Sequence, residues 1–385
     1  MHHPALDVTR LAAALSLRDL TDPASGRHAM QLVLDELVAA LAAWSGATVR
    51  VHRAPPVVSA RNNYDRLYYP PAGVARDARY SRWLGPDVLL RTQTSAMIPP
   101  LLDDLAADPT WTDLLLVCPG LVYRRDQIDR HHVGEPHQVD VWRIRRGQPP
   151  LGPDALHDMI GVALAAALPG WRHRAVAASH PYTVEGLQLD ALDAAGDALE
   201  IGECGLASPR VLGDAGLDPG HVSGLAMGLG LDRLVMLRKG LDDIRLLRSS
   251  DPRIAVQMRD LAPWKPVSSM PPSWRDLSIV VAADDLAEDL GDRVRAALGE
   301  RAAAVESVTV RSATPYAELS PAARERLGIG PDQQNLLVRV VLRDLERTLT
   351  TDEANQLRDE IYAALHRGAV AQWAQAPRPR RPLGF

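Results

Sequence analysis

Residues 114–144 read LLLVCPGLVYRRDQIDRHHVGEPHQVDVWRI, and this stretch is the most informative about the fold. It opens with an apolar run that ends at Tyr123. It closes with a run, His137 to Ile144, in which polar and apolar residues alternate. Alternation with a period of two is typical of a β-strand with two different faces. We therefore predict two strands joined by the polar loop 124–136. So long and charged a loop between paired strands is usually functional.

The polar loop and the strand after it carry a specific set of charges. Arg124 stands where the first strand ends, and carboxylates and histidines follow it. An arginine projecting from a strand can neutralise a phosphate while a carboxylate attacks it. Gln138 and Asp140 share one face of the second strand, where an amide beside a carboxylate suits an α-ammonium group. The local pattern fits a solvated hairpin with surface charges equally well.

A glycine-rich segment, GLAMGLGLDR at residues 224–233, is the second motif. Glycines let a ligand approach the backbone closely, and Arg233 at the head of the following helix can reach a terminal phosphate. A dinucleotide-binding fingerprint is disfavoured, because the third glycine is missing and no βαβ unit surrounds the segment. Tight packing between a strand and a helix is the alternative explanation.

The rest of the chain divides at a proline-rich linker, residues 262–272. Before it, helical spacing predicts a helix over 25–44, capped by Asp22 or Ser25, and a short strand at 47–51. After it, strands and helices recur in a pattern that fits the two βαβ-like halves of a ferredoxin-like domain. Further strands are expected at 88–92, 199–201, 276–282, 305–312 and 335–342, and further helices at 155–168, 286–298 and 353–366.

Composition excludes several classes of protein. The 385 residues suffice for two or three domains, and no apolar run approaches the roughly 18–20 residues that a membrane span needs. Cys118 and Cys204 lie far apart, so neither structural zinc nor a disulfide framework is expected. The N-terminus reads as neither a signal nor a transit peptide, which predicts a cytoplasmic protein. A net charge of −5 argues against coating by nucleic acid, although local basic patches can still bind tRNA.

Taken together, the two arginine motifs resemble motifs 2 and 3 of class II aminoacyl-tRNA synthetases. The longer match is to phenylalanyl-tRNA synthetases, specifically the single-chain type found in mitochondria. The resemblance is colinear over about residues 28 to 375, which is more specific than any single motif. The further matching segments are NNYDRL at 62–67 with ARD at 75–77, LLRTQTS at 89–95, EI at 200–201 with CG at 204–205, GLDDIRLL at 240–247, RDLS at 275–278 and ERTLT at 346–350.

The resemblance implies an α+β protein, with a class II synthetase catalytic core built on an antiparallel sheet and then a small ferredoxin-like domain. It implies ATP-dependent activation of an amino acid, either phenylalanine or one with a related or more polar side chain, and transfer to tRNA. ATP and Mg²⁺ are the expected cofactors, and tRNA is expected to meet the C-terminal domain. A monomer or a homodimer is expected, with no membrane partner. The expected parts are a core at 1–261, the linker at 262–272, an anticodon-binding-like domain at 273–376 and a tail at 377–385.

The resemblance also carries site residues over, position by position. Arg124 would grip the α-phosphate of ATP and Arg233 its γ-phosphate, and these two are the expected catalytic residues. Glu200 is a candidate contact for Mg²⁺ or substrate. The residues expected beside ATP also include Asp126, His132 and Pro136. The residues expected around the amino acid are Gln93, Ser95, Gln138, Asp140, His180, Tyr182 and Ala226.

The chain departs from the family at several of these positions. The family stacks adenine on a phenylalanine where this chain has Pro136, and it has histidine and glutamate at Gln93 and Asp140. The largest departure is in the side-chain pocket, where the family's Phe-Pro-Phe corresponds to His180-Pro181-Tyr182. A buried polar group without a partner costs about 1–3 kcal/mol. The pair thus favours a polar or charged substrate, unless Tyr182 keeps its ring in place and His180 faces water, which would leave phenylalanine as the substrate.

Two other functions remain open at this point. A repurposed synthetase would pass the activated amino acid to an acceptor other than tRNA in a biosynthetic pathway. A non-catalytic paralogue would only bind tRNA or an amino acid. The C-terminal domain counts against the first of these, by analogy with the family. The presence of both Arg124 and Arg233 counts against the second.

Overall fold

The structure is a computed structural model, and it describes residues 5–71, 73, 76, 80–125, 127–266 and 270–371. Backbone contacts divide the chain into two compact units. The first comprises Met1–Arg125 and Val133–Lys265, and the second comprises Asp126–His132 and Pro266–Phe385. Part of the polar loop therefore groups with the C-terminal unit rather than with the strands that flank it.

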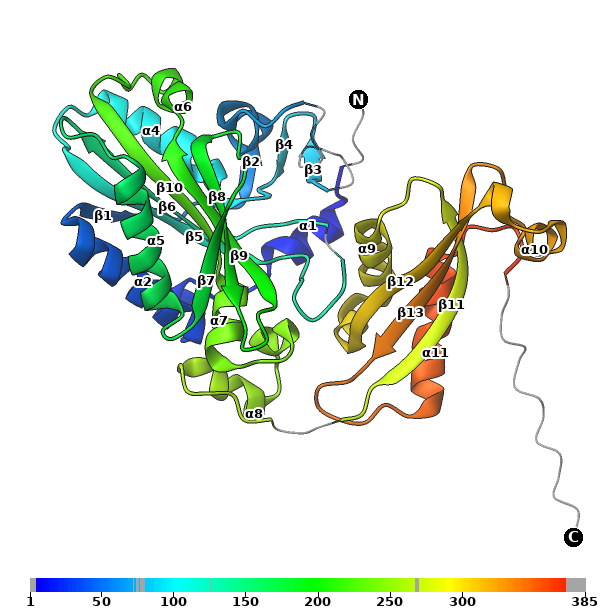
Figure 1. The fold of residues 1–385 in the computed structure, drawn as a ribbon. Helices are drawn as coiled ribbons and strands as arrows, with labels where there is room; N and C mark the ends of the chain where they lie inside the picture. The colour runs from blue at the N-terminus through cyan, green and yellow to red at the C-terminus, as the bar shows by residue number, and fades with distance from the viewer. Residues whose placement is uncertain are drawn as a thin grey trace, which may run out of the picture. The chain divides into compact units, whose positions relative to one another are not determined.

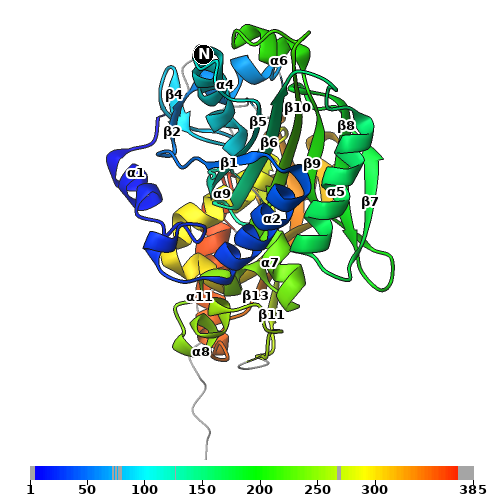
Figure 2. The same ribbon diagram turned by 90° about the vertical axis from the view of Figure 1, so that its left-hand side faces the viewer.

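A seven-stranded sheet forms the centre of the first unit, in the order β1-β5-β6-β10-β9-β8-β7. β1 runs parallel to β5, and every other neighbouring pair is antiparallel. β1 and β7 lie at the two edges (Figure 2). The strands are β1 (Thr48–Val51), β5 (Asp113–Leu121), β6 (His137–Arg146), β7 (Arg172–Ala177), β8 (Thr183–Leu192), β9 (Ala198–Ala207) and β10 (Val222–Gly230).

The predicted pair of strands around the polar loop is confirmed as β5 and β6. They are antiparallel neighbours, with Cys118 opposite Asp140 and Leu116 opposite Trp142. Both strands are buried over most of their length, and successive residues face opposite sides of the sheet. The central strands therefore need a covering layer on each face.

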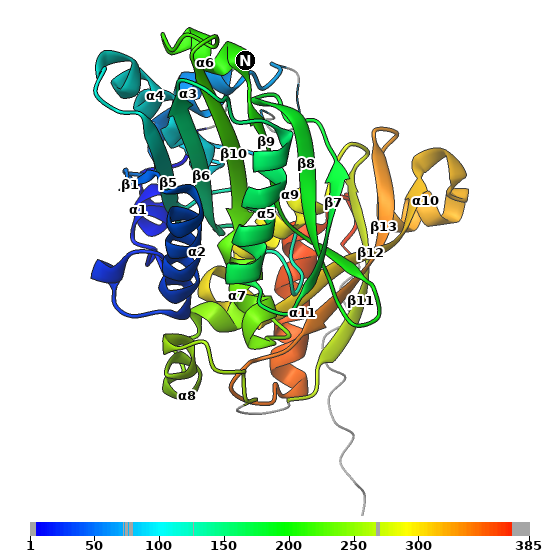
Figure 3. The ribbon, with the colours of Figure 1, turned by 60° about the vertical axis from the view of Figure 1, so that its left-hand side comes forward.

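Helices α2 (Ala29–Ser45) and α5 (Pro153–Ala167) lie side by side over one face of the sheet, as Figures 1 and 3 show. α2 begins at Ala29 rather than at the predicted Ser25, because His28 is its cap. The Met30 amide donates to the His28 ring nitrogen Nδ1 at 3.1 Å. Asp22 instead caps the 3₁₀ turn Pro23–Ser25. The helix ends at Gly46, whose φ of 62° is the left-handed conformation that favours glycine.

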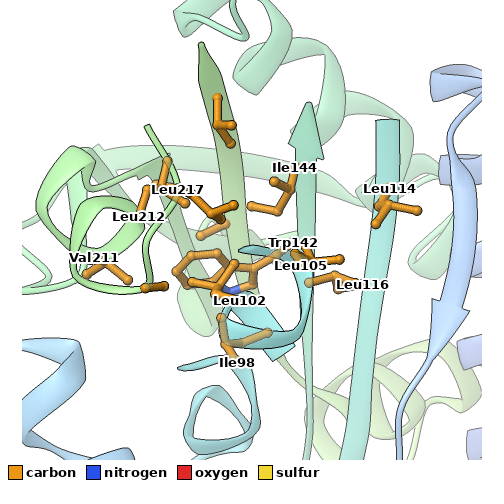
Figure 4. Packing of buried hydrophobic residues seen from close by; sticks show 14 of the residues in the cluster. Ile98, Leu102, Leu105, Leu114, Leu116, Trp142, Ile144, Val211, Leu212 and Leu217 are labelled. Carbon is orange, nitrogen blue, oxygen red and sulfur yellow. The ribbon is translucent and has the colours of Figure 1, made fainter. Parts of the chain in front are cut away.

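The other face is covered by α4 (Ile98–Ala107) and α6 (Pro209–Asp214). Figure 4 shows the apolar side chains of both helices gathered around Trp142, with Leu114 and Leu116 of β5 and Ile144 of β6 beside it. Trp142 is fully buried. This cluster forms the apolar end of the sheet face that carries the candidate site. The remaining helices and strands of the first unit are α1 (Val8–Leu15), β2 (Val57–Ser59), α3 (Ala60–Asn63), β3 (Arg82–Gly85), β4 (Val88–Leu90), α7 (Leu231–Lys239) and α8 (Pro252–Ala255).

The second unit has a three-stranded antiparallel sheet in the order β11-β13-β12. Its chain order is strand, helix, strand, short helix, strand, helix, because α10 lies between β12 and β13. Apart from α10, this order matches a ferredoxin-like domain up to its last strand. Within residues 270–371 no fourth strand forms, although Arg367 N donates to Val280 O of β11 at 2.8 Å after the last helix. Ile128 of the polar loop is buried in this unit's core. The elements are β11 (Ser273–Ala282), α9 (Ala287–Leu298), β12 (Val305–Pro315), α10 (Pro321–Leu327), β13 (Gln333–Leu342) and α11 (Thr351–Leu365).

In the part of the chain that the structure describes, every helix is too short or too polar to cross a membrane.

Two glycines of the first unit should respond in opposite directions to alanine. A Cβ at Gly202 on β9 would lie 2.3 Å from the carbonyl oxygen of Gly228, so the backbone of β9 or β10 would have to shift. Gly202→Ala is expected to lower the free energy of unfolding by about 1–3 kcal/mol. Gly161, exposed on α5, has open space where an added methyl group would lie, so Gly161→Ala should raise it by about 0.5–1 kcal/mol. Urea unfolding of both variants checks this, and equal midpoints would contradict the tight approach of β9 to β10.

Candidate active site

Three adjacent strands, β6, β10 and β9, bring the site residues into rows across the sheet. The register sets Asp140 opposite Gly228, and Gly228 opposite Glu203. Directly opposite residues share a face of a sheet, so these three form one row. The next row, on the side of the apolar cluster of Figure 4, consists of Trp142, Ala226 and Gly205.

Asp140 is buried at one end of the first row and accepts three hydrogen bonds. The hydroxyls of Thr94 and Ser95 donate to its Oδ2 at 2.8 and 3.0 Å. The indole Nε1 of Trp142 donates to its Oδ1 at 3.2 Å. Burial raises the pKa of Asp140 to about 6, although these three hydrogen bonds act to lower it. The carboxyl group therefore titrates close to neutral pH.

Glu203 is the centre of a polar cluster at the other end of the row. Its Oε1 accepts a hydrogen bond from the Tyr182 hydroxyl at 2.5 Å, and its Oε2 lies 2.9 Å from Nε2 of His180. Within the described residues, the buried Nδ1 of His180 has no hydrogen-bond partner, so Glu203 is the polar contact of this ring. Tyr182 is only 3% exposed, whereas the Glu203 side chain is 35% exposed. The Glu203 side chain is therefore more exposed than those of His180 and Tyr182.

The charge of Glu203 is stabilised by its neighbours. Burial acts to raise its pKa, but the hydrogen bond and charge of His180, the Tyr182 hydroxyl and the charge of Arg124 together hold the pKa below its ordinary value. Burial and the nearby Glu203 carboxylate raise the pKa of Tyr182 well above its ordinary value. Tyr182 thus stays a hydrogen-bond donor, and Glu203 stays an anion.

Arg124 and Gln93 are held in place by backbone and side-chain contacts. The Nε of Arg124 donates to the carbonyl oxygen of Thr92 at 2.7 Å. The Gln93 amide is oriented at both ends, since its Oε1 accepts from the Tyr69 hydroxyl at 2.7 Å and its Nε2 donates to Asn63 O at 2.8 Å. These contacts reduce the freedom of two long side chains before any ligand binds.

The two predicted arginines emerge at the same end of the sheet. β6 begins there, with Gln138 opposite both Gly120 of β5 and Gly230 of β10. Arg124 follows β5 from that end, and Arg233 follows β10 on the first turn of α7. Two arginines therefore follow the sheet at the same end, and this suits a ligand with several negative charges.

Glu200, on β9, lies beside Arg233 of α7. Its backbone carbonyl accepts a hydrogen bond from Nη1 of Arg233 at 2.7 Å, and its side chain is exposed. Among the described residues, no three His, Cys, Asp or Glu side chains gather closely enough to hold a metal by themselves. An exposed carboxylate next to an arginine is compatible with Mg²⁺ that arrives bound to phosphates, because such an ion keeps phosphate and water ligands and needs few from the protein.

Three residues predicted to lie beside ATP are placed differently from one another. Pro136 precedes β6, and its carbonyl oxygen accepts from Val122 N at 2.9 Å. His132 belongs to the segment that groups with the second unit, and its Nδ1 lies 2.7 Å from Oδ2 of Asp129. Asp126 lies outside the described residues.

Glu203 is the site residue that the sequence did not single out. The expected strand ended at Ile201, whereas β9 runs from Ala198 to Ala207. A predicted strand that continued beyond Ile201 would have pointed to Glu203, because Glu203 and Gly205 are two residues apart and so share a face of the strand.

A mixed sheet with one parallel edge pair, and an arginine after each of two central strands, is the core of a class II tRNA synthetase. The family model described as tRNA synthetases class II core domain (F) matches residues 15–258, and the chain belongs to this family. The predicted fold class and the predicted enzyme class, an aminoacyl-tRNA ligase, are thereby confirmed. The match ends before β11, the first strand of the second unit.

Among its relatives are phenylalanine--tRNA ligase alpha subunits. The protein of Prochlorococcus marinus strain MIT 9313 is 36% identical over 257 residues, covering 64% of this chain and 73% of the relative. That of strain NATL2A is 33% identical over 244 residues, covering 62% and 69%. A solved pyrrolysyl tRNA synthetase structure from Desulfitobacterium hafniense matches with a TM-score of 0.43 and 17% identity, over 62% of this chain and 77% of that one.

Proposed function

We propose that the protein activates an amino acid with ATP and transfers it to tRNA. In the first step the amino acid carboxylate attacks the α-phosphate, and pyrophosphate leaves. In the second a tRNA hydroxyl attacks the aminoacyl-adenylate, and AMP leaves. Family membership supports this proposal. The observation that carries it is that Arg124 and Arg233 follow β5 and β10 at the same end of the sheet whose central strands bear the Asp140–Gly228–Glu203 row.

The residues act mainly by positioning and by neutralising charge. Arg124 holds the α-phosphate and Arg233 the γ-phosphate. Gln138 and Asp140 hold the α-ammonium group, and Ser95 contributes by fixing Asp140 through its hydrogen bond of 3.0 Å. The role of Gln93 is to line the same end of the site. His132, Pro136 and Asp126 remain proposed contacts of ATP.

Mg²⁺ would be held by ATP together with Glu200, and it supplies neutralisation of phosphate charge when bound. The protein contributes two fixed cations, Arg124 and Arg233. Arg233, whose Nη1 donates to the Glu200 carbonyl oxygen, keeps the start of β9 close to the start of α7. The Glu200 side chain is thereby presented beside the phosphates.

The second unit is proposed as an anticodon-binding domain of the ferredoxin type, as in the single-chain synthetases. The order of its main elements supports this assignment, since it is strand, helix, strand, strand, helix once the short connecting helix α10 is set aside. The relatives are called alpha subunits, so those proteins assemble with another chain. For this chain we propose a monomer or a homodimer acting in the cytoplasm, where a charging enzyme meets its tRNA.

Amino-acid-dependent ATP–pyrophosphate exchange, followed by charging of total tRNA, tests the proposal. Exchange with at least one amino acid and alkali-labile, acid-stable labelling of tRNA are expected. Exchange without charging would remove the tRNA part of the proposal. Failure of exchange with every amino acid would remove the activation step.

The raised pKa of Asp140 predicts a pH dependence of amino acid capture. The carboxyl must be ionised to attract an ammonium group, and its pKa is about 6. The value of kcat/KM for the amino acid should therefore fall about tenfold per pH unit as the pH drops below 6. Glu203 does not cause this fall, because its pKa is held below the ordinary value.

Asp140→Asn is the matched variant for this profile. It should have a lower kcat/KM at pH 7.5 and lose the inflection near pH 6. ATP titrates identically in both experiments, so the difference between the two profiles isolates Asp140. An unchanged inflection in the variant would contradict the assignment.

A further inference from the structure

We infer that the amino acid taken by this enzyme has a basic side chain, and that the Glu203 carboxylate is the group that recognises it. This inference rests on the proposed function, and it goes beyond it by naming the substrate class and the residue that selects it. Three observations carry it: the row across the sheet, the accessibility of Glu203, and the use of the apolar space by Tyr182.

The row across β6, β10 and β9 places two carboxylates on either side of a glycine. Asp140 and Glu203 are two strands apart, so their backbones are separated by about 9.5 Å. Their side chains approach over Gly228, where a Cβ would lie 3.7 Å from Oδ2 of Asp140 and 3.9 Å from Cγ of Glu203. A compact molecule with two cationic groups matches this spacing. Its α-ammonium group would face Asp140 and its side-chain nitrogen would face Glu203.

Glu203 has hydrogen-bonding capacity left for such a nitrogen. Each carboxylate oxygen can accept two hydrogen bonds. Oε1 accepts one from Tyr182, and Oε2 pairs with His180. These two partners, both more buried than the Glu203 side chain, fix the orientation of the carboxylate, and each of its oxygens keeps the capacity for a further hydrogen bond. A charged hydrogen bond to an oriented carboxylate is stronger than one between neutral groups.

The aromatic space behind the carboxylate is already filled by the protein. The ring of Tyr182 stacks on Trp142, with centroids 6.0 Å apart and an angle of 22° between the planes. Both belong to the apolar cluster that includes Ala226. A substrate phenyl ring would therefore have to lie against the Glu203 carboxylate, and it would strip water from this anion without offering a hydrogen bond.

The balance of charges around Glu203 also favours a substrate with a cationic side chain. Arg124 is the nearby fixed cation that lowers the pKa of Glu203, and in the proposed reaction its charge is taken up by the α-phosphate. Asp140 is matched by the α-ammonium group. Glu203 would then keep His180 as its remaining partner of opposite charge. A basic side chain would take the place that the charge of Arg124 leaves.

The test compares wild type with Glu203→Gln, which keeps the size of the side chain and removes its charge. ATP–pyrophosphate exchange is measured with lysine, arginine, histidine, ornithine, 2,4-diaminobutyrate, phenylalanine and tyrosine. Wild type should use a basic amino acid, and Glu203→Gln should raise its KM by about 100-fold or more while the KM for ATP stays within about twofold. Asp158→Asn, an exposed carboxylate on α5, is the matched control and should change neither constant.

Different failures lead to different conclusions. Exchange with phenylalanine that Glu203→Gln leaves unchanged would overturn this inference while the proposed function stands. If no amino acid supports exchange, the proposed function fails, and calorimetric binding of the same panel in the presence of ATP decides the inference. Binding of a basic amino acid that Glu203→Gln abolishes would support it, and absence of such binding would overturn it.

A gain of function provides a second, independent check. The variant His180→Phe/Tyr182→Phe/Glu203→Ala removes all three polar groups of the cluster and opens space beside Gly228, which the Glu203 side chain approaches in wild type. Its preference should shift from the basic amino acid to phenylalanine by at least about tenfold in the ratio of kcat/KM values. A folded triple variant, judged by circular dichroism, that still prefers the basic amino acid would contradict the role of Glu203.

Discussion

Replacing Arg124 by alanine is expected to lower the rate of amino-acid-dependent ATP–pyrophosphate exchange by about 10²–10³-fold. The guanidinium is anchored by its hydrogen bond of 2.7 Å to the Thr92 carbonyl, so it is oriented before ATP arrives. Negative charge accumulates on the α-phosphate as the carboxylate attacks. A fixed cation lowers the energy of that state more than the energy of bound ATP, and the loss should appear chiefly in kcat.

The control for this variant is Arg172→Ala. Arg172 is exposed on the edge strand β7, and its guanidinium donates to the Asp193 carbonyl at 2.9 Å. It has the same charge as Arg124 but lies on β7, which is five strands away from β5 in the sheet. The exchange rate of this control should match wild type. A fall of less than about threefold for Arg124→Ala, with Arg172→Ala unchanged, would contradict the role of Arg124 in the first step.

Trp142→Ala is expected to destabilise the first unit by about 3–5 kcal/mol. The indole is fully buried at the centre of the cluster in Figure 4. Its removal leaves a cavity among α4, α6 and the sheet, and it also removes the Nε1 hydrogen bond to Asp140 and the stacking partner of Tyr182. The amino acid site should therefore loosen together with the core.

Urea unfolding checks this effect, with Trp274→Ala as the matched control. Trp274 is 64% exposed on β11, so the same deletion should cost less than about 1 kcal/mol there. Trp142→Phe separates the two contributions, because it keeps most of the volume and loses only the hydrogen bond, which is worth about 1–1.5 kcal/mol. A midpoint for Trp142→Ala that lies close to wild type would contradict the central packing role.

Local patterns predicted the paired strands and the positions of the two arginines. The apolar run up to Tyr123 and the alternation of polar and apolar residues from His137 onward predicted two strands, and the structure has β5 and β6 there. The glycine-rich segment became a strand and a helix, β10 and α7, with Arg233 on the first turn. These features depend on neighbours within a few residues, which is why sequence suffices for them. The start of α2 was misplaced, because the choice among Asp22, Ser25 and His28 as its cap depends on tertiary packing.

The paired strands β5 and β6, the succession of β10 and α7, and the family could be inferred from the amino-acid sequence, because they are properties of short segments in a fixed order. The strands β7 and β8 were not predicted. The surroundings of Glu203, in contrast, depend on how distant segments pair. Its partners His180 and Tyr182 precede β8, and their approach to β9 depends on a register that shifts between Val184 and Leu187. A register shift of one residue exchanges the two faces of a strand, and no local pattern specifies it. For this reason the charge of the amino acid site became visible only once the strands were paired.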